Sequence, residues 1–332
     1  MKKILSLFVF FLSGVYALHP AIVLEEFVFT KPPFASCHAS TLTEAQKGEI
    51  LCSWFAGTEE GADDVKIWMA KKSKKEWSLP SIVAEEARPC WNPVLYTMPS
   101  GEILLFYKAG GHPQIWSGFI KRSLDGGHTW LSGPDLPAGV IGPAKNRPLL
   151  LDDGTLLCGS STESWKRWGC WIDITSDRGN TWQKSSPINV DDQLFGIIQP
   201  ALVFFKDKIK LFARSHQIGY ICTAESNDAG LTWSSATPTD LPNPNSSVDA
   251  INLSDGRILL VYNHSKENRY PLNVALSCDG GKSWDMKVVL ESEPGEFSYP
   301  CVIETKDKLV HISYTWNRTN IKHVVLDIAK LQ

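Results

Sequence analysis

The chain has 332 residues, with 33 Lys and Arg against 36 Asp and Glu and a formal net charge of −3. It contains no long basic run. Binding to nucleic acid needs clustered cations to neutralise phosphates, so the composition excludes nucleic acid as a partner. A closed domain of this length buries roughly 75% of its unfolded surface and needs no metal or disulfide for stability. We therefore expect neither a cofactor nor a metal.

The first residues have the pattern of a secretory leader. Lys2 and Lys3 precede an apolar stretch over residues 4–16, and Val15 and Ala17 are branched or small residues ahead of a cleavage site. The sequence predicts a signal peptide over residues 1–17 and a mature domain over residues 18–332 that is secreted or periplasmic. The apolar stretch is short for a spanning helix, so we expect no membrane span in the mature chain.

Six hairpin signals divide the mature chain. Each is a pair of turn-forming residues followed by an apolar strand. They are Lys47-Gly48, Ser100-Gly101, Asp153-Gly154, Asp207-Lys208, Asp255-Gly256 and Asp307-Lys308. The apolar segment over residues 21–29 predicts one further strand ahead of them. Six such hairpins predict six β-sheets and no long helix.

A short phrase recurs between these hairpins. It reads SLDGGHTW at 123–130, TSDRGNTW at 175–182, SNDAGLTW at 226–233 and SCDGGKSW at 277–284. The closing tryptophans lie 52, 51 and 51 residues apart, a period typical of propeller blades. A degenerate copy ends at Trp77, 53 residues before Trp130. Asp and Ser or Thr can hydrogen-bond their own turn, and we expect each Trp to fill a seam between neighbouring blades.

These repeats predict an all-β fold, a six-bladed β-propeller that forms a single domain and acts as a monomer. The last blade begins near Tyr299 and runs out of chain after three strands, so we expect residues 21–29 to supply its fourth strand and close the ring. The eight cysteines show no ligand or disulfide spacing, and we expect most of them to be buried. Cys158 and Cys170, on strands expected to be adjacent, are the pair expected to form a disulfide.

The loops that enter the first strand and leave the second strand of each blade should meet on one face of the ring. Charged, amide and aromatic residues follow one another in these loops. They are His38, Trp91, Asn92, Lys145, Arg147, Gln199 and Tyr299 in the entry loops, and Glu59, Asp63, Asp64, Glu163, Arg214, Arg269 and Arg318 in the exit loops. Polar groups on a rigid scaffold are typical of a sugar-binding bowl, so we expect an oligosaccharide or glycoconjugate to bind there.

The recurring phrase resembles the Asp-box, S/T-x-D-x-G-x-T/S-W, of the sialidase (neuraminidase) superfamily of BNR-repeat β-propellers. This resemblance implies a glycosidase with three arginines for the substrate carboxylate, a tyrosine nucleophile activated by a glutamate, and an aspartate acid/base. It assigns the nucleophile to Tyr299, two of the arginines to Arg214 and Arg269, and the acid/base to Asp63 or Asp64.

Two positions depart from the pattern of the superfamily. His38 stands where the first arginine would be, and Gln199 stands where the activating glutamate would be. A neutral amide cannot take a proton from a phenol, and an imidazole binds a carboxylate less well than a guanidinium does. The departures indicate altered chemistry, in which His38 is a candidate general acid or base and Glu59 joins Asp63 and Asp64 as a further candidate.

The leading hypothesis is a secreted, exo-acting glycoside hydrolase that removes a terminal sugar next to, or bearing, a carboxylate. Other side chains of the rim are expected to contact this sugar, namely Trp91, Asn92, Lys145, Arg147, Glu163 and Arg318. One alternative is a hydrolase or lyase that uses His38 on a rhamnosyl-glucuronate, similar to sialidase-fold enzymes with that activity. Another is a non-catalytic glycan-binding propeller. The catalytic hypotheses require His38, Gln199, Arg214, Arg269 and Tyr299 to converge at the ring axis.

Overall fold

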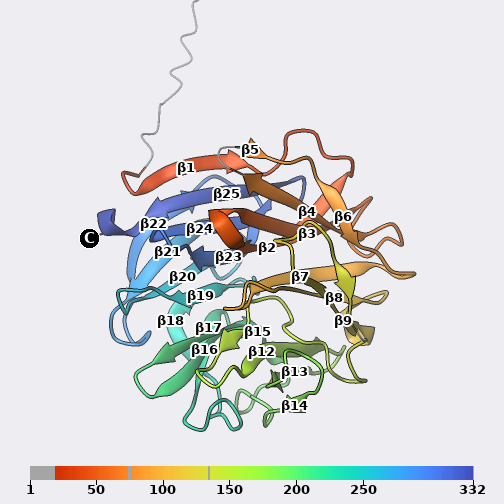
Figure 1. Cartoon of the computed structure of the whole chain (residues 1–332). Coiled ribbons are helices and arrows are strands. Elements are labelled where there is room, and N and C mark those ends of the chain that lie inside the picture. The colour runs from red at the N-terminus through yellow and green to blue at the C-terminus, as the bar shows by residue number, and fades with distance from the viewer. Residues whose placement is uncertain (1–18, 74–75, 134, 332) are drawn as a thin grey trace, which may run out of the picture.

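Six antiparallel β-sheets arranged in a ring make up most of the molecule. The computed structural model describes residues 19–73, 76–133 and 135–331, and the predicted signal peptide lies outside these ranges. In Figure 1 the first strand of each sheet lies near the centre of the ring and the last strand near the periphery. The predicted all-β, six-bladed propeller is confirmed.

The strands follow the order expected from the repeat. Blade 1 contains β2 (Ser36–Glu44), β3 (Ile50–Gly57), β4 (Lys66–Ser73), β5 (Glu76–Trp77) and β6 (Ser81–Ala84). Blade 2 contains β7 (Cys90–Thr97), β8 (Ile103–Ala109), β9 (Ser117–Ser123) and β10 (Leu131–Ser132). Blade 3 contains β11 (Leu149–Leu150), β12 (Leu156–Glu163), β13 (Trp168–Thr175) and β14 (Gln183–Lys184).

The second half of the ring repeats this arrangement. Blade 4 contains β15 (Gly196–Phe205), β16 (Lys208–His216), β17 (Tyr220–Ser226) and β18 (Thr237–Pro242). Blade 5 contains β19 (Asp249–Asn252), β20 (Ile258–Asn263), β21 (Leu272–Ser277) and β22 (Asp285–Glu291). Blade 6 contains β23 (Phe297–Glu304), β24 (Leu309–Trp316), β25 (Asn320–Asp327) and β1 (Ile22–Phe27). Three short 3₁₀ turns are η1 (Gln46–Gly48), η2 (Pro113–Ile115) and η3 (Ile328–Lys330).

The N-terminal strand closes the ring, as predicted. β1 pairs antiparallel with β25, the last strand of the chain. Glu26 on β1 also joins this blade to blade 1, because its Oε1 accepts hydrogen bonds from Nε1 of Trp77 at 2.8 Å and from Nδ1 of His323 at 2.9 Å. The same carboxylate pairs with Lys72 at 2.5 Å. One side chain therefore ties the two ends of the ring together.

The four repeated phrases form turns that are held by their own side chains. In the third blade Oδ1 of Asp177 accepts the N–H of Thr181 at 2.8 Å, and its Oδ2 accepts the Thr181 hydroxyl at 2.7 Å. The same two bonds recur at Asp125, Asp228 and Asp279. The tryptophan that closes each turn packs toward the preceding blade, as Trp182 does against Phe106 with ring centroids 6.3 Å apart. The predicted role of these tryptophans in the seams is confirmed.

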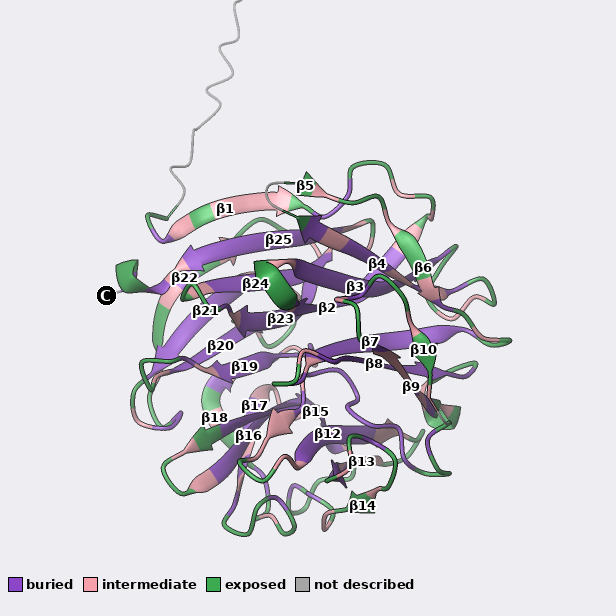
Figure 2. Ribbon diagram, viewed as in Figure 1, coloured by how far each residue is buried: buried purple, intermediate pink, exposed green. Residues whose placement is uncertain are grey.

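The apolar core lies in the seams between blades. Figure 2 shows inner and middle strands that are mainly buried and outer strands of mixed exposure. Phe55 of blade 1 and Leu105 of blade 2 belong to one such cluster. Packing on both faces holds the inner strands rigidly, and these are the strands that carry the loops of the candidate site.

The predicted disulfide between Cys158 and Cys170 is wrong. The two residues do lie on adjacent strands, but Cys158 is opposite Asp173 and Cys170 is opposite Ser161. They are offset by three positions, so their side chains point to opposite faces of the sheet and into different seams. All eight cysteines are unpaired, and seven are buried, as expected for most of them. Of the helices in the described ranges, none is long and apolar enough to cross a membrane.

Candidate functional site

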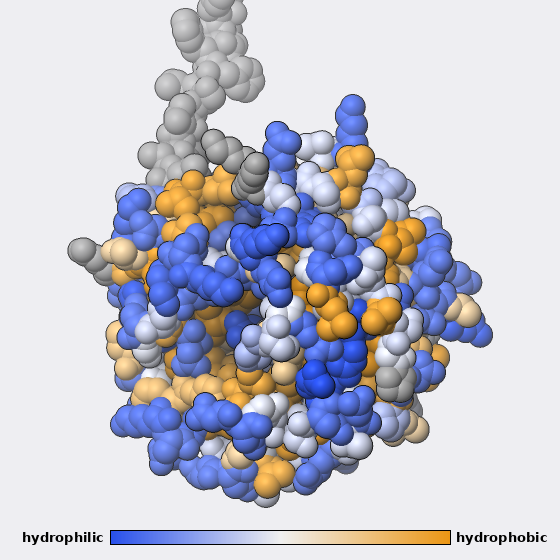
Figure 3. Space-filling view, viewed as in Figure 1, coloured by the Kyte–Doolittle hydropathy of each residue, from blue (hydrophilic) through white to orange (hydrophobic). Residues whose placement is uncertain are grey.

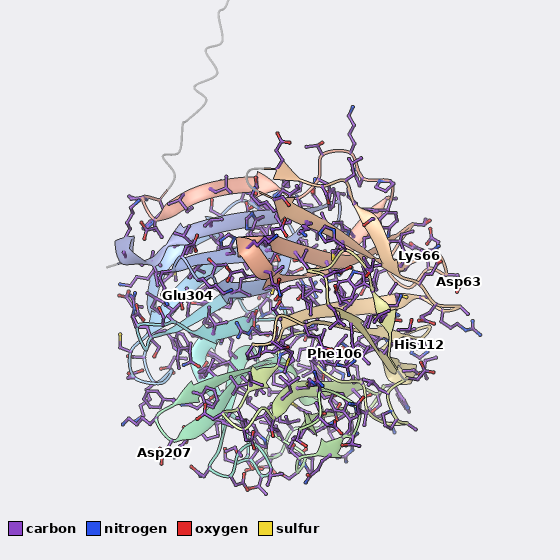
Figure 4. The ribbon with its side chains drawn as sticks, in the orientation of Figure 1. Asp63, Lys66, Phe106, His112, Asp207 and Glu304 are labelled. Carbon is purple, nitrogen blue, oxygen red and sulfur yellow. The ribbon has the colours of Figure 1, made fainter. Side chains whose placement is uncertain are left out.

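The two ends of the ring carry different connections. In Figure 4, Asp63 and His112, from loops that follow second strands, lie at one edge of the molecule. Glu304, at the end of β23, and Asp207, from the turn between β15 and β16, lie on the opposite side of the view. Nearly all predicted site residues belong to the end with Asp63 and His112, which is called the loop face below.

β-bulges shape the inner strands where they meet the loop face. Ala39, Asn92, Gln199 and Tyr299 have φ angles of 55°, 37°, 55° and 53°, and the pairing with the second strand shifts register at each of them. A proline follows Asn92, Gln199 and Tyr299. Proline has no N–H to continue the ladder, and positive φ is strained for a residue other than glycine. Such bulges redirect side chains next to functional sites, and here they redirect Gln199 and Tyr299.

Tyr299 is held by a guanidinium and an amide. Its hydroxyl accepts a hydrogen bond from Nη1 of Arg214 at 2.8 Å and a longer one from Nε2 of Gln199 at 3.4 Å. Arg214 also donates from Nε to Oδ1 of Asn245 at 2.9 Å and from Nη2 to the Asn245 carbonyl at 2.6 Å. These bonds fix Arg214, and its positive charge therefore points at the phenol oxygen.

Two further arginines lie close to Tyr299 and share one carboxylate. Nη1 of Arg269 donates to Oε1 of Glu296 at 2.8 Å, and the Arg269 guanidinium lies 5.7 Å from the centre of the Tyr299 ring. Nε of Arg318 donates to both oxygens of Glu296, at 2.9 and 3.0 Å, and its Nη1 donates to Glu60. Within the described ranges Nη2 of neither arginine donates a hydrogen bond, so both retain donors for an anion.

The ring of His38 lies against the ring of Tyr299. His38 is 1% exposed, its ring centre is 4.2 Å from that of Tyr299, and neither ring nitrogen has a partner among the described residues. Burial holds the pKa of His38 well below its usual value, and the charges of Arg318, Arg269, Arg214 and Lys145 lower that pKa further. The imidazole is therefore neutral at physiological pH and unsuited to donate a proton as a general acid, but it presents one donor and one acceptor.

Lys145 connects blade 3 to the strand that carries Tyr299. Its Nζ donates to Oδ1 of Asn146 at 2.8 Å and to the carbonyl of Pro300. Asn146 in turn donates from Nδ2 to the carbonyl of Gln199 at 2.9 Å. Burial lowers the pKa of Lys145, and the nearby Asp249 carboxylate opposes that shift. Lys145 and Asn146 therefore position the two bulges that present Tyr299 and Gln199.

Apart from Glu60, which pairs with Arg318, the carboxylates of the first exit loop lie away from these contacts. Asp64 accepts the N–H of Thr58 at 3.0 Å and its hydroxyl at 2.6 Å, and these bonds hold the pKa of Asp64 below its usual value. Glu59 and Asp63 are exposed, and neither contacts Tyr299 or its arginines. A carboxylate with a depressed pKa is a poor proton donor at neutral pH, so Asp64 is not poised as a general acid.

Three other predicted residues occupy structural positions. Trp91 is buried and donates from Nε1 to the carbonyl of Gly110 at 2.7 Å, which leaves its ring no free face for a sugar. Asn92 is buried and donates to the carbonyl of Ala144 at 3.2 Å. Arg147 lines a cavity at the hairpin-turn end of the ring.

That cavity has a volume of about 390 Å³. Its lining includes Glu44, Gln46 and Lys306, and the Arg147 guanidinium lies 5.9 Å from the centre of the Tyr96 ring. In Figure 3, hydrophilic side chains surround a hollow near η1. The hollow is separate from the Tyr299 cluster.

Two residues that organise the cluster were not predicted as site residues. Glu296 joins Arg269 to Arg318, and Asn245 holds Arg214. The sequence gives no signal for Glu296 beyond its position three residues before Tyr299. Asn245 lies at a φ of 56° in a segment rich in Asn, Pro and Ser, which indicates a turn but not a role in fixing an arginine.

Comparisons with known proteins agree with this architecture. The model of a BNR repeat-like domain matches residues 48–312. A search of curated proteins gives no match. Among solved structures, a protein of unknown function from Dyadobacter fermentans DSM 18053 has a TM-score of 0.79 at 19% identity, over 93% of this chain and 99% of that chain.

Two structures of known activity are also similar. The NanB sialidase of Streptococcus pneumoniae has a TM-score of 0.74 at 14% identity, over 92% of this chain and 71% of that chain. The intramolecular trans-sialidase of Ruminococcus gnavus has a TM-score of 0.73 at 14% identity, over 94% of this chain and 99% of that chain. At these identities the likeness shows a shared fold.

Proposed function

Since the chain belongs to the BNR repeat-like domain family, we propose that it is a glycoside hydrolase that removes a terminal, carboxylate-bearing sugar from a glycan. The observation that supports this most is the 2.8 Å hydrogen bond from Arg214 to the hydroxyl of Tyr299. Arg269 and Arg318 lie in the same cluster with donors to spare. Guanidiniums beside a phenol combine an anion-binding site with a nucleophile.

Each side chain of the cluster has a role in this proposal. Arg269 and Arg318 bind the sugar carboxylate through their unoccupied donors. The Tyr299 oxygen attacks the anomeric carbon, and Arg214 with the Gln199 amide stabilises negative charge on that oxygen. His38 packs its ring against that of Tyr299 and so holds the phenol in place. The predicted signal peptide supports action outside the cytoplasm.

Gln199 is the observation that favours a second candidate. The residue donates to Tyr299 and has no group that can accept the phenol proton. A propeller that binds anionic glycans without cleaving them would tolerate this amide. The other alternative is a hydrolase or lyase that acts on a rhamnosyl-glucuronate. Such an enzyme would use the neutral His38 on β2 of blade 1.

A panel of glycans separates these functions. The purified mature protein is incubated with sialyl, uronyl and rhamnosyl-glucuronyl oligosaccharides and with matched neutral glycans, and the released sugar is measured by chromatography. We expect release from one anionic class and none from the neutral glycans. If the protein binds a glycan without releasing product, and this binding persists in His38→Ala and Tyr299→Phe, the glycan-binding function is favoured. If no anionic glycan is turned over, the proposed hydrolase activity is wrong.

Removal of the Arg269 guanidinium tests carboxylate recognition. In Arg269→Ala we expect KM for the anionic substrate to rise by about 10- to 100-fold, since a charge-assisted contact is worth about 1.5–3 kcal/mol. The measurement is steady-state kinetics on the substrate that the panel identifies. Arg178→Ala is the matched control, because Arg178 is exposed on an Asp-box turn and, among the described residues, its side chain pairs with Glu102 alone. An unchanged KM in Arg269→Ala would contradict the assignment.

A further inference from the structure

A glycosidase of this kind needs a carboxyl group that donates a proton to the leaving oxygen. Near the Tyr299 cluster, Glu60 and Glu296 are paired with arginines, and Asp64 is bound by Thr58. Protonation of any of these three would weaken the contacts that hold it. Glu163, a rim residue predicted only to contact the sugar, is not held in this way within the described ranges.

Glu163 is the last residue of β12, on the edge of the strand that faces blade 4. Ser161, two positions earlier and hence on the same face, accepts the N–H of Gln199 at 3.2 Å. Trp168 is the hairpin partner of Glu163, and the Arg214 guanidinium lies 5.9 Å from the centre of the Trp168 ring. Glu163 therefore flanks both residues that bind the Tyr299 hydroxyl.

The Glu163 side chain is half-buried, and it makes no hydrogen bond or ion pair with any residue in the described ranges. It interacts electrostatically with Arg214 of blade 4 and with Glu60 of blade 1, so it lies within reach of groups across the mouth of the ring. Burial raises the pKa of Glu163, Arg214 opposes the shift, and Glu60 adds to it. A free carboxyl that keeps its proton to a higher pH suits a proton donor.

We propose that Glu163 is the catalytic general acid and base of this site, an inference that rests on the proposed function. In the first step Tyr299, whose proton has passed to water, bonds through its oxygen to the anomeric carbon. The bond from that carbon to the leaving oxygen breaks with its electron pair on the oxygen, which takes the proton of Glu163. In the second step the Glu163 carboxylate takes a proton from water, the water oxygen bonds to the anomeric carbon, and the Tyr299 oxygen leaves.

Leaving-group dependence provides the test. Wild type and Glu163→Gln are compared on two glycosides of the same anionic sugar, one with a sugar alcohol and one with a nitrophenol as leaving group. A nitrophenolate leaves without a proton, whereas an alcohol does not. We expect kcat on the sugar aglycone to fall by about 10²- to 10⁴-fold. The nitrophenyl glycoside should still give a rapid burst of nitrophenol, followed by slow turnover because the second step lacks its base.

The pH profile is a second readout that a merely structural role would not move. In wild type, kcat/KM on the sugar aglycone should fall as pH rises through the pKa of Glu163, because the proton donor is then lost. In Glu163→Gln this alkaline limb should be absent. KM should stay close to wild type, and the thermal midpoint of the variant should match, since the side chain makes no hydrogen bond or ion pair with the residues that the structure describes.

Control variants test which carboxyl group is the general acid. Glu267→Gln changes an exposed carboxylate in a loop of the same face and should leave both reactions unchanged. If Asp64→Asn shows the leaving-group dependence and Glu163→Gln does not, the assignment to Glu163 is overturned while the hydrolase stands. Equal effects of Glu163→Gln on both glycosides overturn it as well. A wild type that cleaves no anionic glycoside removes the proposed function, and this inference with it.

Discussion

Tyr299→Phe should abolish turnover while leaving the propeller folded. We expect kcat/KM on the anionic glycan to fall by about 10³-fold or more, because the variant has no oxygen to attack the anomeric carbon and Arg214 has no charge to stabilise. The phenylalanine ring keeps its contacts with His38 and Arg269, which involve the ring and not the hydroxyl. Activity and the near-ultraviolet circular dichroism spectrum, measured together, separate loss of chemistry from loss of structure.

A second buried tyrosine serves as the control for this variant. Tyr262 of blade 5 is 1% exposed, and its hydroxyl bonds His264, away from the arginine cluster. Tyr262→Phe removes the same atom from the same ring system and should keep wild-type kcat/KM. If Tyr299→Phe also turns over at the wild-type rate, the tyrosine is not the nucleophile and a mechanism without a covalent intermediate is required.

The fold could be predicted because its determinants repeat. The spacing of Trp130, Trp182, Trp233 and Trp284 gives the blade period, and the truncated last blade leaves one place for residues 21–29. These are local turn signals and a count, which need no knowledge of long-range contacts. The predicted disulfide between Cys158 and Cys170 was wrong because it depends on the pairing register of two strands. That two strands follow each other in the chain does not specify this register.

The candidate site also has one part that could be predicted from the sequence and one part that could not. Tyr299, Arg214, Arg269 and His38 could be placed at one end of the ring because each lies next to an inner-strand entry or a second-strand exit. Which way a loop side chain turns could not be read from the sequence. Asp64 turns back onto Thr58.

Asn92 shows that a bulge alone does not turn a side chain toward the Tyr299 cluster. Asn92-Pro93, Gln199-Pro200 and Tyr299-Pro300 share one X-Pro signal at equivalent strand positions, yet only the latter two face the cluster. A proline near the start of these three strands is a sequence signal for such a bulge. The direction of each side chain depends on the neighbouring blade, and that contact is long-range.

Glu26 should make the ring sensitive to acid. Its folded-state pKa is lowered to about 2 from an ordinary 4.5; burial opposes this shift and hydrogen bonds from His323, Lys72 and Trp77 more than offset it. Stability from this depressed pKa is present above pH 4.5 and is lost as pH falls toward 2. Burial also lowers the pKa of His311, which bonds His323, to about 4. The unfolded chain then binds a proton that the folded chain excludes, so stability also declines between pH 6.5 and 4.

The variant Glu26→Ala isolates the carboxylate part of this effect. We expect it to lower the free energy of unfolding at pH 7 by about 2 kcal/mol, discounted for the partial exposure of the group, and to lower the thermal midpoint by about 5 °C. Between pH 4.5 and 2 wild type should lose the stability that this carboxylate contributes, which the variant does not have. Between pH 6.5 and 4.5 the variant should be at least as acid-sensitive as wild type, because Glu26 raises the pKa of His323 and of His311. Glu76→Ala, an exposed carboxylate on β5 of the same seam, should match wild type throughout. Parallel stability curves for wild type and Glu26→Ala below pH 4.5 would show that the ring is closed by strand pairing and packing alone.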